Sequence, residues 1–442
     1  MPEASSGPDA PAARGGTSVA DSGRPLWCDG RFVTFWAAQS VSELGDRVSE
    51  IALPFVAVGL GASATEVALL TALIWLPNLL ALLVGSWVDR RPRKRPLLVG
   101  ADLARALVVL TVPAAALVGG LTLAQLFAVA VLLGTWSMLF RSAWQPFFVA
   151  LVRREQYVEA NGLLSATRSG SFVVGPALGG GLVQLLTAPV ALVVDGLSFL
   201  LSAVLLRRVR VTERAPAPAT GGEPLRARLA EGLRLVVRHP ILRPALCCVS
   251  WVNFFTIMTS ALLVVFASRD LGLPAGVIGV ALGVGAGGGL FGALLAGRVA
   301  RWIGTGRTIA LGAVVFTVPL AALPLAHGSD LAKAAVLAGV EAASAFGVML
   351  FDVNLNAVTA AAIPDAVRAR VQGAFTSVNY GARPLGAAAG GVLAGLVGLG
   401  PTLVVAGLGG ALGALWLVGT PLLALRSVDD VEDPDGGGSP GS

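Results

Sequence analysis

Four ionisable residues near the start of the chain have types and a spacing that suit proton transfer. Glu43, Asp46, Arg47 and Glu50 stand at positions i, i+3, i+4 and i+7, which is one face of a helix. Arg47 can pair with Glu43 and Glu50 on adjacent turns, so three acids share one base. A carboxylate in a low-dielectric cavity binds a proton more readily than in water. We expect Asp46 and Glu43, with Glu50 beside them, to carry protons; a structural charge network or a water-filled funnel wall is the alternative.

The helix that bears these charges lies in a strongly apolar chain. The 442 residues are 55% hydrophobic and 13% charged, whereas soluble domains average about 25% charged residues. Most of the apolar runs exceed the ~20 residues that cross a bilayer, and they are continuous, which favours helices over a barrel. They fall at 33–58, 64–88, 97–118, 122–147, 161–185, 189–206, 244–268, 275–297, 306–327, 334–360, 373–397 and 401–424. The sequence therefore predicts an all-α membrane protein with twelve transmembrane helices in a lipid bilayer.

The basic residues predict the orientation of these helices. Lys and Arg concentrate in cytoplasmic loops of membrane proteins. Of the 32 basic residues, 25 lie in alternate loops and the two tails, and two lie in the opposite loops. Because the basic loops alternate with the others, we expect both termini to be cytoplasmic. The same distribution, in short loops between apolar runs, argues against a nucleic-acid partner.

The longest loop divides the chain into two groups of six helices. Within it, Leu225 to Val237 places apolar residues at helical spacing and Arg on other faces, which is typical of an amphipathic helix at a membrane interface. The predicted organisation is a disordered cytoplasmic tail at 1–30, a bundle at 31–206, a linker with this helix at 207–243, a second bundle at 244–425 and a disordered cytoplasmic tail at 426–442.

The two halves resemble each other in sequence. A basic turn at 151–162 precedes Gly175 and Pro176, and a basic turn at 363–373 precedes Arg383-Pro-Leu-Gly, an offset of about 210 residues. Repeats of this kind are common in secondary transporters. They predict two pseudo-symmetric six-helix bundles.

The turn after the second helix resembles a motif of the major facilitator superfamily. It reads Gly85-Ser-Trp-Val-Asp-Arg-Arg-Pro-Arg-Lys-Arg95, and Gly85, Asp89, Arg90, Arg93 and Lys94 match the pattern, with Pro92 where a Gly is usual. The resemblance implies the major facilitator fold and a latch in which Asp89 pairs with basic groups and a helix N-terminus. The alternative is an ordinary basic anchor.

The fifth apolar run resembles the antiporter motif of the same family. Gly175, Pro176, Gly179 and Gly180 carry this likeness. The motif is often seen in exporters, and its small residues let helices approach closely while Pro bends the span. Generic helix packing in a glycine-rich protein is the alternative.

Four short stretches are similar to a subgroup that contains the enterobactin exporter and macrolide efflux proteins. These are residues 39–46, 101–105, 159–161 and 195–199. The resemblance implies a secondary transporter that exports a drug-like, siderophore or natural-product molecule by alternating access, driven by protons. It also implies a monomer.

Further charges lie inside the predicted spans, where they are costly and therefore often functional. Asp102 and Arg105 are spaced i,i+3 and form a predicted structural pair. Arg141 could meet the acids of the first span, because both spans belong to one bundle.

Charges elsewhere in the spans suggest gating and a second proton site. Arg168 and Arg383 occupy related positions in the two halves and could pair with acids as gating contacts. Glu341 lies mid-span and is the proton candidate of the second half. Asp195 and Asp352 are also in spans, without an assigned role.

Aromatic and amide side chains could line a substrate path, although packing is the commoner role of an aromatic residue in a span. A wide apolar cavity with a few acids would suit an amphipathic molecule, including a cationic one. The candidates are Trp36, Gln39, Trp136, Asn253, Phe254, Asn354 and Tyr380.

Several classes of function find no support in the sequence. Three Cys and two His have no metal-binding spacing, no phosphate-binding loop of the ATPase type occurs, and no catalytic constellation stands out. We expect no cofactor and no enzyme. An importer of the same fold and a non-transporting membrane sensor or scaffold remain alternatives to an exporter.

Overall fold

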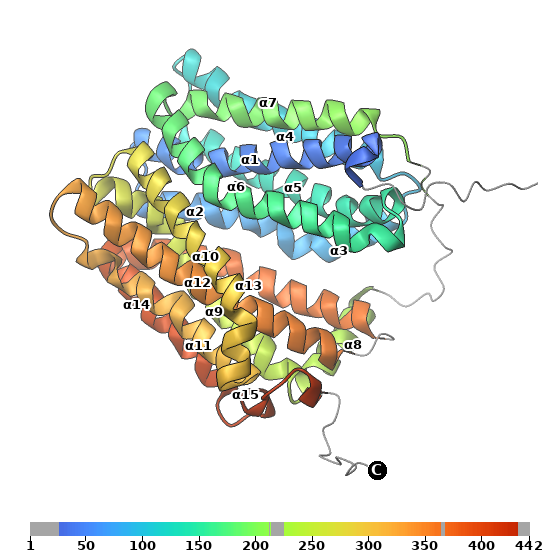
Figure 1. Cartoon of the computed structure of the whole chain (residues 1–442). Coiled ribbons are helices and arrows are strands. Elements are labelled where there is room, and N and C mark those ends of the chain that lie inside the picture. The colour runs from blue at the N-terminus through green and yellow to red at the C-terminus, as the bar shows by residue number, and fades with distance from the viewer. Residues whose placement is uncertain (1–25, 212, 214–224, 364–366, 432–442) are drawn as a thin grey trace, which may run out of the picture.

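The computed structural model describes residues 26–211, 213, 225–363 and 367–431. Both predicted tails and the predicted linker fall partly outside this range, at 1–25, 432–442 and 214–224. Within the described residues the chain is helical and forms two bundles (Figure 1).

The first bundle contains six long helical segments. Its second segment is one span in three parts, because Pro77 lacks the N–H that a continuous helix needs and a short 3₁₀ turn results. The segments are α1 Gly30–Gly59, α2 Ala64–Trp75 with 3₁₀ residues Leu76–Leu80 and α3 Ala81–Asp89, α4 Arg95–Leu117, α5 Leu123–Leu151, α6 Tyr157–Leu186 and α7 Ala188–Arg208.

The second bundle repeats this arrangement after a shorter helix, α8 Leu225–Arg238. Its long segments are α9 Leu242–Arg269, α10 Ala275–Ile303, α11 Thr305–Thr317 with 3₁₀ residues Val318–Leu325, α12 Asp330–Ala362, α13 Arg368–Val397 and α14 Leu399–Ala411 with 3₁₀ residues Leu412–Leu417. The four-residue helix α15 Pro421–Ala424 follows.

Ten of these twelve long segments are apolar and long enough to cross a membrane. The other two, α1 and α13, have 30 residues each, or about 45 Å of helix, which exceeds the ~30 Å hydrocarbon core. Both carry ionisable residues in the middle, which lowers their mean hydropathy. The prediction of a twelve-helix membrane fold is confirmed.

The two bundles meet at one end and diverge toward the other (Figure 1). We call the end that carries α8 and the turn 90–94 the basic end, and the opposite end, where the loop at Ala62 meets α9, the closed end. At the closed end the hydroxyl of Thr65 donates to the carbonyl of Gly391 over 2.7 Å. The backbones of Gly180 on α6 and Gly279 on α10 are also in contact, because neither residue has a side chain to hold them apart.

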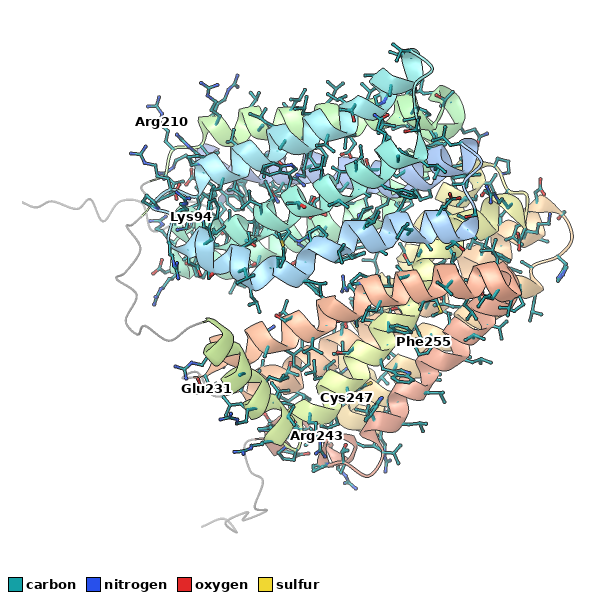
Figure 2. The ribbon with its side chains drawn as sticks, turned by 180° about the vertical axis from the view of Figure 1, so that it is seen from behind. Lys94, Arg210, Glu231, Arg243, Cys247 and Phe255 are labelled. Carbon is teal, nitrogen blue, oxygen red and sulfur yellow. The ribbon has the colours of Figure 1, made fainter. Side chains whose placement is uncertain are left out.

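Helix α8 packs on the second bundle at the basic end. Gly232 lies against the carbonyl of Arg370 on α13, and Val236 is fully buried. Glu231 pairs with Arg370 at 2.7 Å. The predicted helix is therefore present, but contacts to α13 hold it in addition to any contact with a membrane surface (Figure 2).

Candidate functional site

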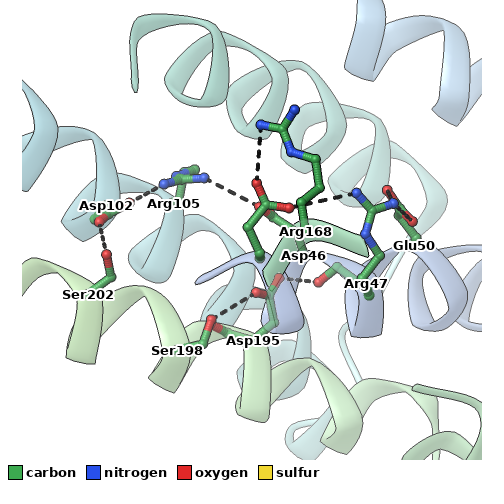
Figure 3. Close-up of polar contacts among 11 residues, drawn as sticks. Asp46, Arg47, Glu50, Asp102, Arg105, Arg168, Asp195, Ser198 and Ser202 are labelled. Atoms are coloured by element: carbon green, nitrogen blue, oxygen red, sulfur yellow. Dashed lines mark hydrogen bonds and ion pairs between the residues drawn. The ribbon is translucent and has the colours of Figure 1, made fainter. Parts of the chain in front are cut away.

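The charged face of α1 forms the ion pairs that its spacing predicts. Nη1 of Arg47 lies 2.6 and 2.8 Å from the two carboxylate oxygens of Glu50, and Nη2 lies 3.9 Å from Glu43. The guanidinium also sits 3.9 Å from the ring centre of Phe172 on α6. Arg47 is therefore held by α1 and α6 together, and Figure 3 shows its pairing with Glu50.

Glycines of the antiporter-like motif allow α6 to approach α1. A Cβ on Gly175 would collide with the side chain of Arg47, and Gly179 packs on the backbone of Val48. The other two members face the second bundle, where Gly180 and the carbonyl of Pro176 contact α10. The motif thus joins the charged helix on one side and the bundle interface on the other.

Arg105 on α4 links the charges of α1 to a buried carboxylate. It is 3% exposed, is bound to Asp102, and also lies 3.9 Å from Asp46. Two ring centres, of Phe140 and Phe199, flank its guanidinium at 4.5 and 4.2 Å. The predicted pair Asp102–Arg105 exists, and the contact to Asp46 extends it into the α1 cluster.

Asp195 on α7 completes this cluster and lay outside the predicted proton sites. It is 1% exposed and accepts hydrogen bonds from the hydroxyls of Ser49 on α1 and Ser198 on its own helix. Gly45 of α1 makes room for it, since a Cβ there would meet Asp195 and Ser198. The spacing of Ser49 from Asp46, i+3 on the charged face of α1, is the sequence signal that could have indicated this contact.

Arg168 on α6 approaches Glu43 at 3.9 Å, so Glu43 lies between two guanidinium groups. Arg168 thus contacts an acid, and its role in gating stays a prediction. The α1 cluster then holds five carboxylates and three guanidiniums, namely Glu43, Asp46, Glu50, Asp102 and Asp195 with Arg47, Arg105 and Arg168. Acids exceed bases by two.

Arg141 and Arg383 form no ion pair with an acid among the described residues, although Asp46 and Glu43 act on the charge of Arg141 and Asp352 acts on that of Arg383. Arg141 on α5 donates instead to the amide oxygen of Asn78 over 2.8 Å. The guanidinium of Arg383 on α13 lies over the rings of Trp75 and Tyr380, with 4.3 and 4.7 Å to the ring centres. The nearest partners of the two arginines are therefore an amide and two aromatic rings.

The candidates of the second half stand apart from the α1 cluster. The backbone of Gly285 on α10 packs against the Cβ of Glu341 on α12. The amides of Asn253 and Asn354 donate to carbonyls of their own helices, and Phe254 packs edge-on against Phe255. These contacts are those of packed helices.

A cavity of about 340 Å³ lies between α2–α3 and α13. Of the predicted path residues Tyr380 lines it. Trp36 donates to Thr167 on α6 over 2.7 Å, Gln39 is buried, and Trp136 is half-buried on α5. The cavity wall is made by Asn78, Ala81, Leu82, Gln372, Gly373, Thr376, Ser377 and Tyr380.

The turn with the latch motif lies exposed at the basic end. The carboxylate of Asp89 makes no hydrogen bond or ion pair within the described part of the chain, and Arg90 and Arg93 are also exposed. The carboxylate of Glu213 caps α4 instead, accepting from the backbone N–H groups of Lys94 and of Arg95, the latter at 3.1 Å. Glu213 was missed because it follows α7, far from α4 in sequence.

Comparisons with known proteins agree with this architecture. A family model described as Major Facilitator Superfamily matches residues 35–387. The chain is 31% identical over 420 residues to the multidrug efflux pump Tap of Mycobacterium tuberculosis, covering 92% of this chain and 96% of Tap. It is 26% identical over 382 residues to an uncharacterized MFS-type transporter, YfiS, of Bacillus subtilis, covering 85% and 89% of the two chains.

Solved structures share the fold. A bacterial homologue of the iron transporter ferroportin, in an inward-facing state, superposes with a TM-score of 0.68 at 18% identity, over 88% of this chain and 98% of that one. The resemblance to the major facilitator superfamily is confirmed. Because the family model spans most of the chain and Tap aligns over nearly its whole length, the chain belongs to the major facilitator superfamily and is a multi-pass membrane transporter of small molecules.

Proposed function

We propose that the protein is a proton-coupled exporter of drug-like or natural-product molecules in the cell membrane. The relatives named as multidrug efflux pumps support export. The observation that carries proton coupling is the excess of two carboxylates in the α1 cluster. Uncompensated negative charge is costly inside a membrane, and protons are the simplest way to neutralise it.

Asp46 is the proposed coupling residue because it is accessible and shares its partner. Its side chain is 41% exposed, whereas Asp102 is fully buried. Both approach Arg105, so a proton on Asp46 would leave Arg105 to Asp102 alone. Loading and release of that proton would change the strength of the contact between α1 and α4. The ion pairs of Glu43 and Glu50 with Arg47 would rearrange in response.

The arrangement of the bundles supports alternating access with the basic end in the cytoplasm. At the closed end three hydrogen bonds join the bundles: Arg269 to the carbonyl of Ala62 at 2.6 Å, Thr65 to Gly391, and the N–H of Gly276 to Gln184 at 2.8 Å. The bundles diverge at the basic end, so substrate would enter from the cytoplasm in this conformation. Both termini would then be cytoplasmic, and we propose that the monomer is the working unit.

The latch residues take a role in the opposite conformation. Because the Asp89 carboxylate has no partner among the described residues while the basic end is open, it is available to bind when that end closes. A negative group at a helix N-terminus or beside Arg is stabilising. Asp89, with Arg90 and Arg93 around it, would hold the outward-facing state.

Everted vesicles with an imposed pH gradient test the proposal. Uptake of a panel of dyes and antibiotics is compared between the wild type, Asp46→Asn and Glu155→Gln, an exposed acid at the basic end that serves as control. We expect gradient-driven uptake in the wild type and control, and none in Asp46→Asn. Undiminished uptake in Asp46→Asn would exclude this residue as the carrier. Absence of uptake by correctly inserted wild type would favour a non-transporting role.

A further inference from the structure

The cavity between the two bundles has one wall from each of them. Asn78, Ala81 and Leu82 come from the α2–α3 span, and residues 372–380 come from α13. Figure 2 shows these two spans facing each other where the bundles diverge. Along α13 the wall runs from Gln372, near the basic end, to Tyr380, deeper in the membrane. The deep end of the cavity is therefore at Asn78 and Tyr380.

Arg141 lies at this deep end, where a hydrogen bond to Asn78 orients its guanidinium. The amide nitrogen of Asn78 donates to the carbonyl of Trp75 over 3.0 Å, which turns its oxygen toward Arg141. The hydrogen bond uses one N–H of a guanidinium that has five. The Arg141 side chain is exposed, and no acidic side chain within the described residues forms an ion pair with it, although Asp46 and Glu43 of the α1 cluster act on its charge from a longer distance. Most of its donors are free to bind a ligand.

Arg383 reaches the same end from the other bundle. Its guanidinium lies over Trp75 and Tyr380, and its Nε is buried without an acceptor. Asp352 on α12 is the acid whose field acts on it, yet the two do not approach within ion-pair distance. Asn78, which contacts Arg141, and Tyr380, which contacts Arg383, both line the cavity, and the two arginines lie directly behind this lining.

We propose that this cavity binds amphipathic organic anions, whose acidic group meets Arg141 and Arg383. The assignment rests on the proposed export function and names the substrate class of that transporter. Two guanidiniums with free donors match a carboxylate or sulfonate, which each can bind with paired hydrogen bonds. Leu82 and Tyr380 give the cavity an apolar and aromatic surface for the body of the molecule, and Trp75 packs against Tyr380.

The same surroundings disfavour organic cations at this position. The lining residues carry no charge of either sign, and a cation in the cavity would lie near the two arginines behind Asn78 and Tyr380. Four acids of the α1 cluster lie within 4 Å of arginines on α1, α4 and α6, and the fifth, Asp195, accepts hydrogen bonds from Ser49 and Ser198. The geometry thus separates a proton site in the first bundle from an anion site between the bundles, in contrast to the cationic substrate that the sequence suggested.

Equilibrium binding to the purified full-length protein tests this assignment. Three probes share one aromatic body: naphthoate is an anion, naphthamide is neutral and naphthylmethylammonium is a cation. Displacement of radiolabelled naphthoate is measured for the wild type, Arg141→Gln, Arg383→Gln and Arg298→Gln. Arg298 is exposed on α10 and serves as the control. Size-exclusion elution and thermal melting confirm that each variant is folded.

We expect the wild type and the Arg298 control to bind naphthoate at least tenfold more tightly than either other probe. Each of the two site variants should lose about tenfold in naphthoate affinity, the effect of one charge-assisted bond, with little change for naphthamide. If Arg383→Gln does not fold, Arg141→Gln alone tests the site. Arg141 is exposed, so we expect its replacement to leave the fold intact.

Three results would overturn the assignment: no naphthoate binding by folded wild type, equal or tighter binding of the cation, or full anion preference in the folded site variants. The measurement needs no proton gradient, so it separates the two proposals. Anion binding without transport would contradict the export proposal and support the anion site. Transport of cationic dyes by a protein without anion preference would support export and contradict the anion site.

Discussion

Gly175 of α6 lies directly against the side chain of Arg47 on α1, where a single added Cβ would collide with the arginine Cβ and Cγ. The contact joins a motif that resembles the antiporter signature to the charged face of α1. It gives the small residue a specific role, which is to leave room for the arginine that binds Glu43 and Glu50.

Gly175→Val should therefore displace Arg47 and impair transport. Overpacking of this kind costs about 1–3 kcal/mol, and it also disturbs the ion pair with Glu50. Gly181→Val is the matched control, because a Cβ on Gly181 meets nothing within 4 Å. Vesicle uptake and melting temperature should fall for Gly175→Val and change little for the control. Equal effects of the two variants would show that glycine at 175 has no special role.

Arg105→Gln should destabilise the first bundle strongly. It leaves Asp102 fully buried with Ser202 and without its cation, and loss of one partner of a buried pair costs about 3–5 kcal/mol. The double variant Arg105→Gln with Asp102→Asn removes the stranded charge and should recover much of the melting temperature. If the double variant melts as low as the single one, the cost comes from packing against Phe140 and Phe199 instead.

A disulfide between α6 and α10 should lock the closed end. A Cβ built on Gly276 lies 3.8 Å from the Cβ of Gln184, which is the usual separation in a disulfide. Gln184→Cys with Gly276→Cys, in a background without Cys28, Cys247 and Cys248, should cross-link on oxidation and stop transport. A reductant should restore transport, and each single variant should be insensitive to oxidant. Full transport by the cross-linked protein would contradict alternating access through this interface.

Asp89→Asn should slow transport and leave this conformation intact. The exposed Asp89 carboxylate makes no hydrogen bond or ion pair within the described residues, so the free energy of unfolding should change by less than about 0.5 kcal/mol, as is typical of surface sites, and the melting temperature should hardly move. Loss of a latch for the opposite state would also raise the fraction of molecules in which residues 184 and 276 cross-link. An unchanged cross-linking rate would argue that the turn is only a basic anchor.

The twelve helices and the charged face of α1 could be predicted because both depend on local spacing. Apolar runs show each span directly, and Glu43, Arg47 and Glu50 are neighbours on adjacent turns of one helix. A contact within one helix follows from its period.

Contacts between distant helices could not be predicted in the same way. Arg383 and Trp75 are separated by about 300 residues, and Asp195 is 146 residues from Ser49. Which ring or hydroxyl faces a charge depends on how the helices are rotated and shifted against each other. Those features are set by packing, which one sequence does not reveal, so Arg141 and Arg383 were expected beside acids and lie beside amide and aromatic groups.

The capping of α4 by Glu213 has a mechanical consequence. Glu213 binds the N-terminus of α4 in the first bundle, and α8 packs on the second bundle through Gly232 and Glu231. Twelve peptide steps join Glu213 to Leu225, and an extended chain covers at most about 3.6 Å per step, or roughly 43 Å. This covalent connection therefore sets an upper limit on the distance between Glu213 and Leu225, and so on how far the two bundles can separate at the basic end.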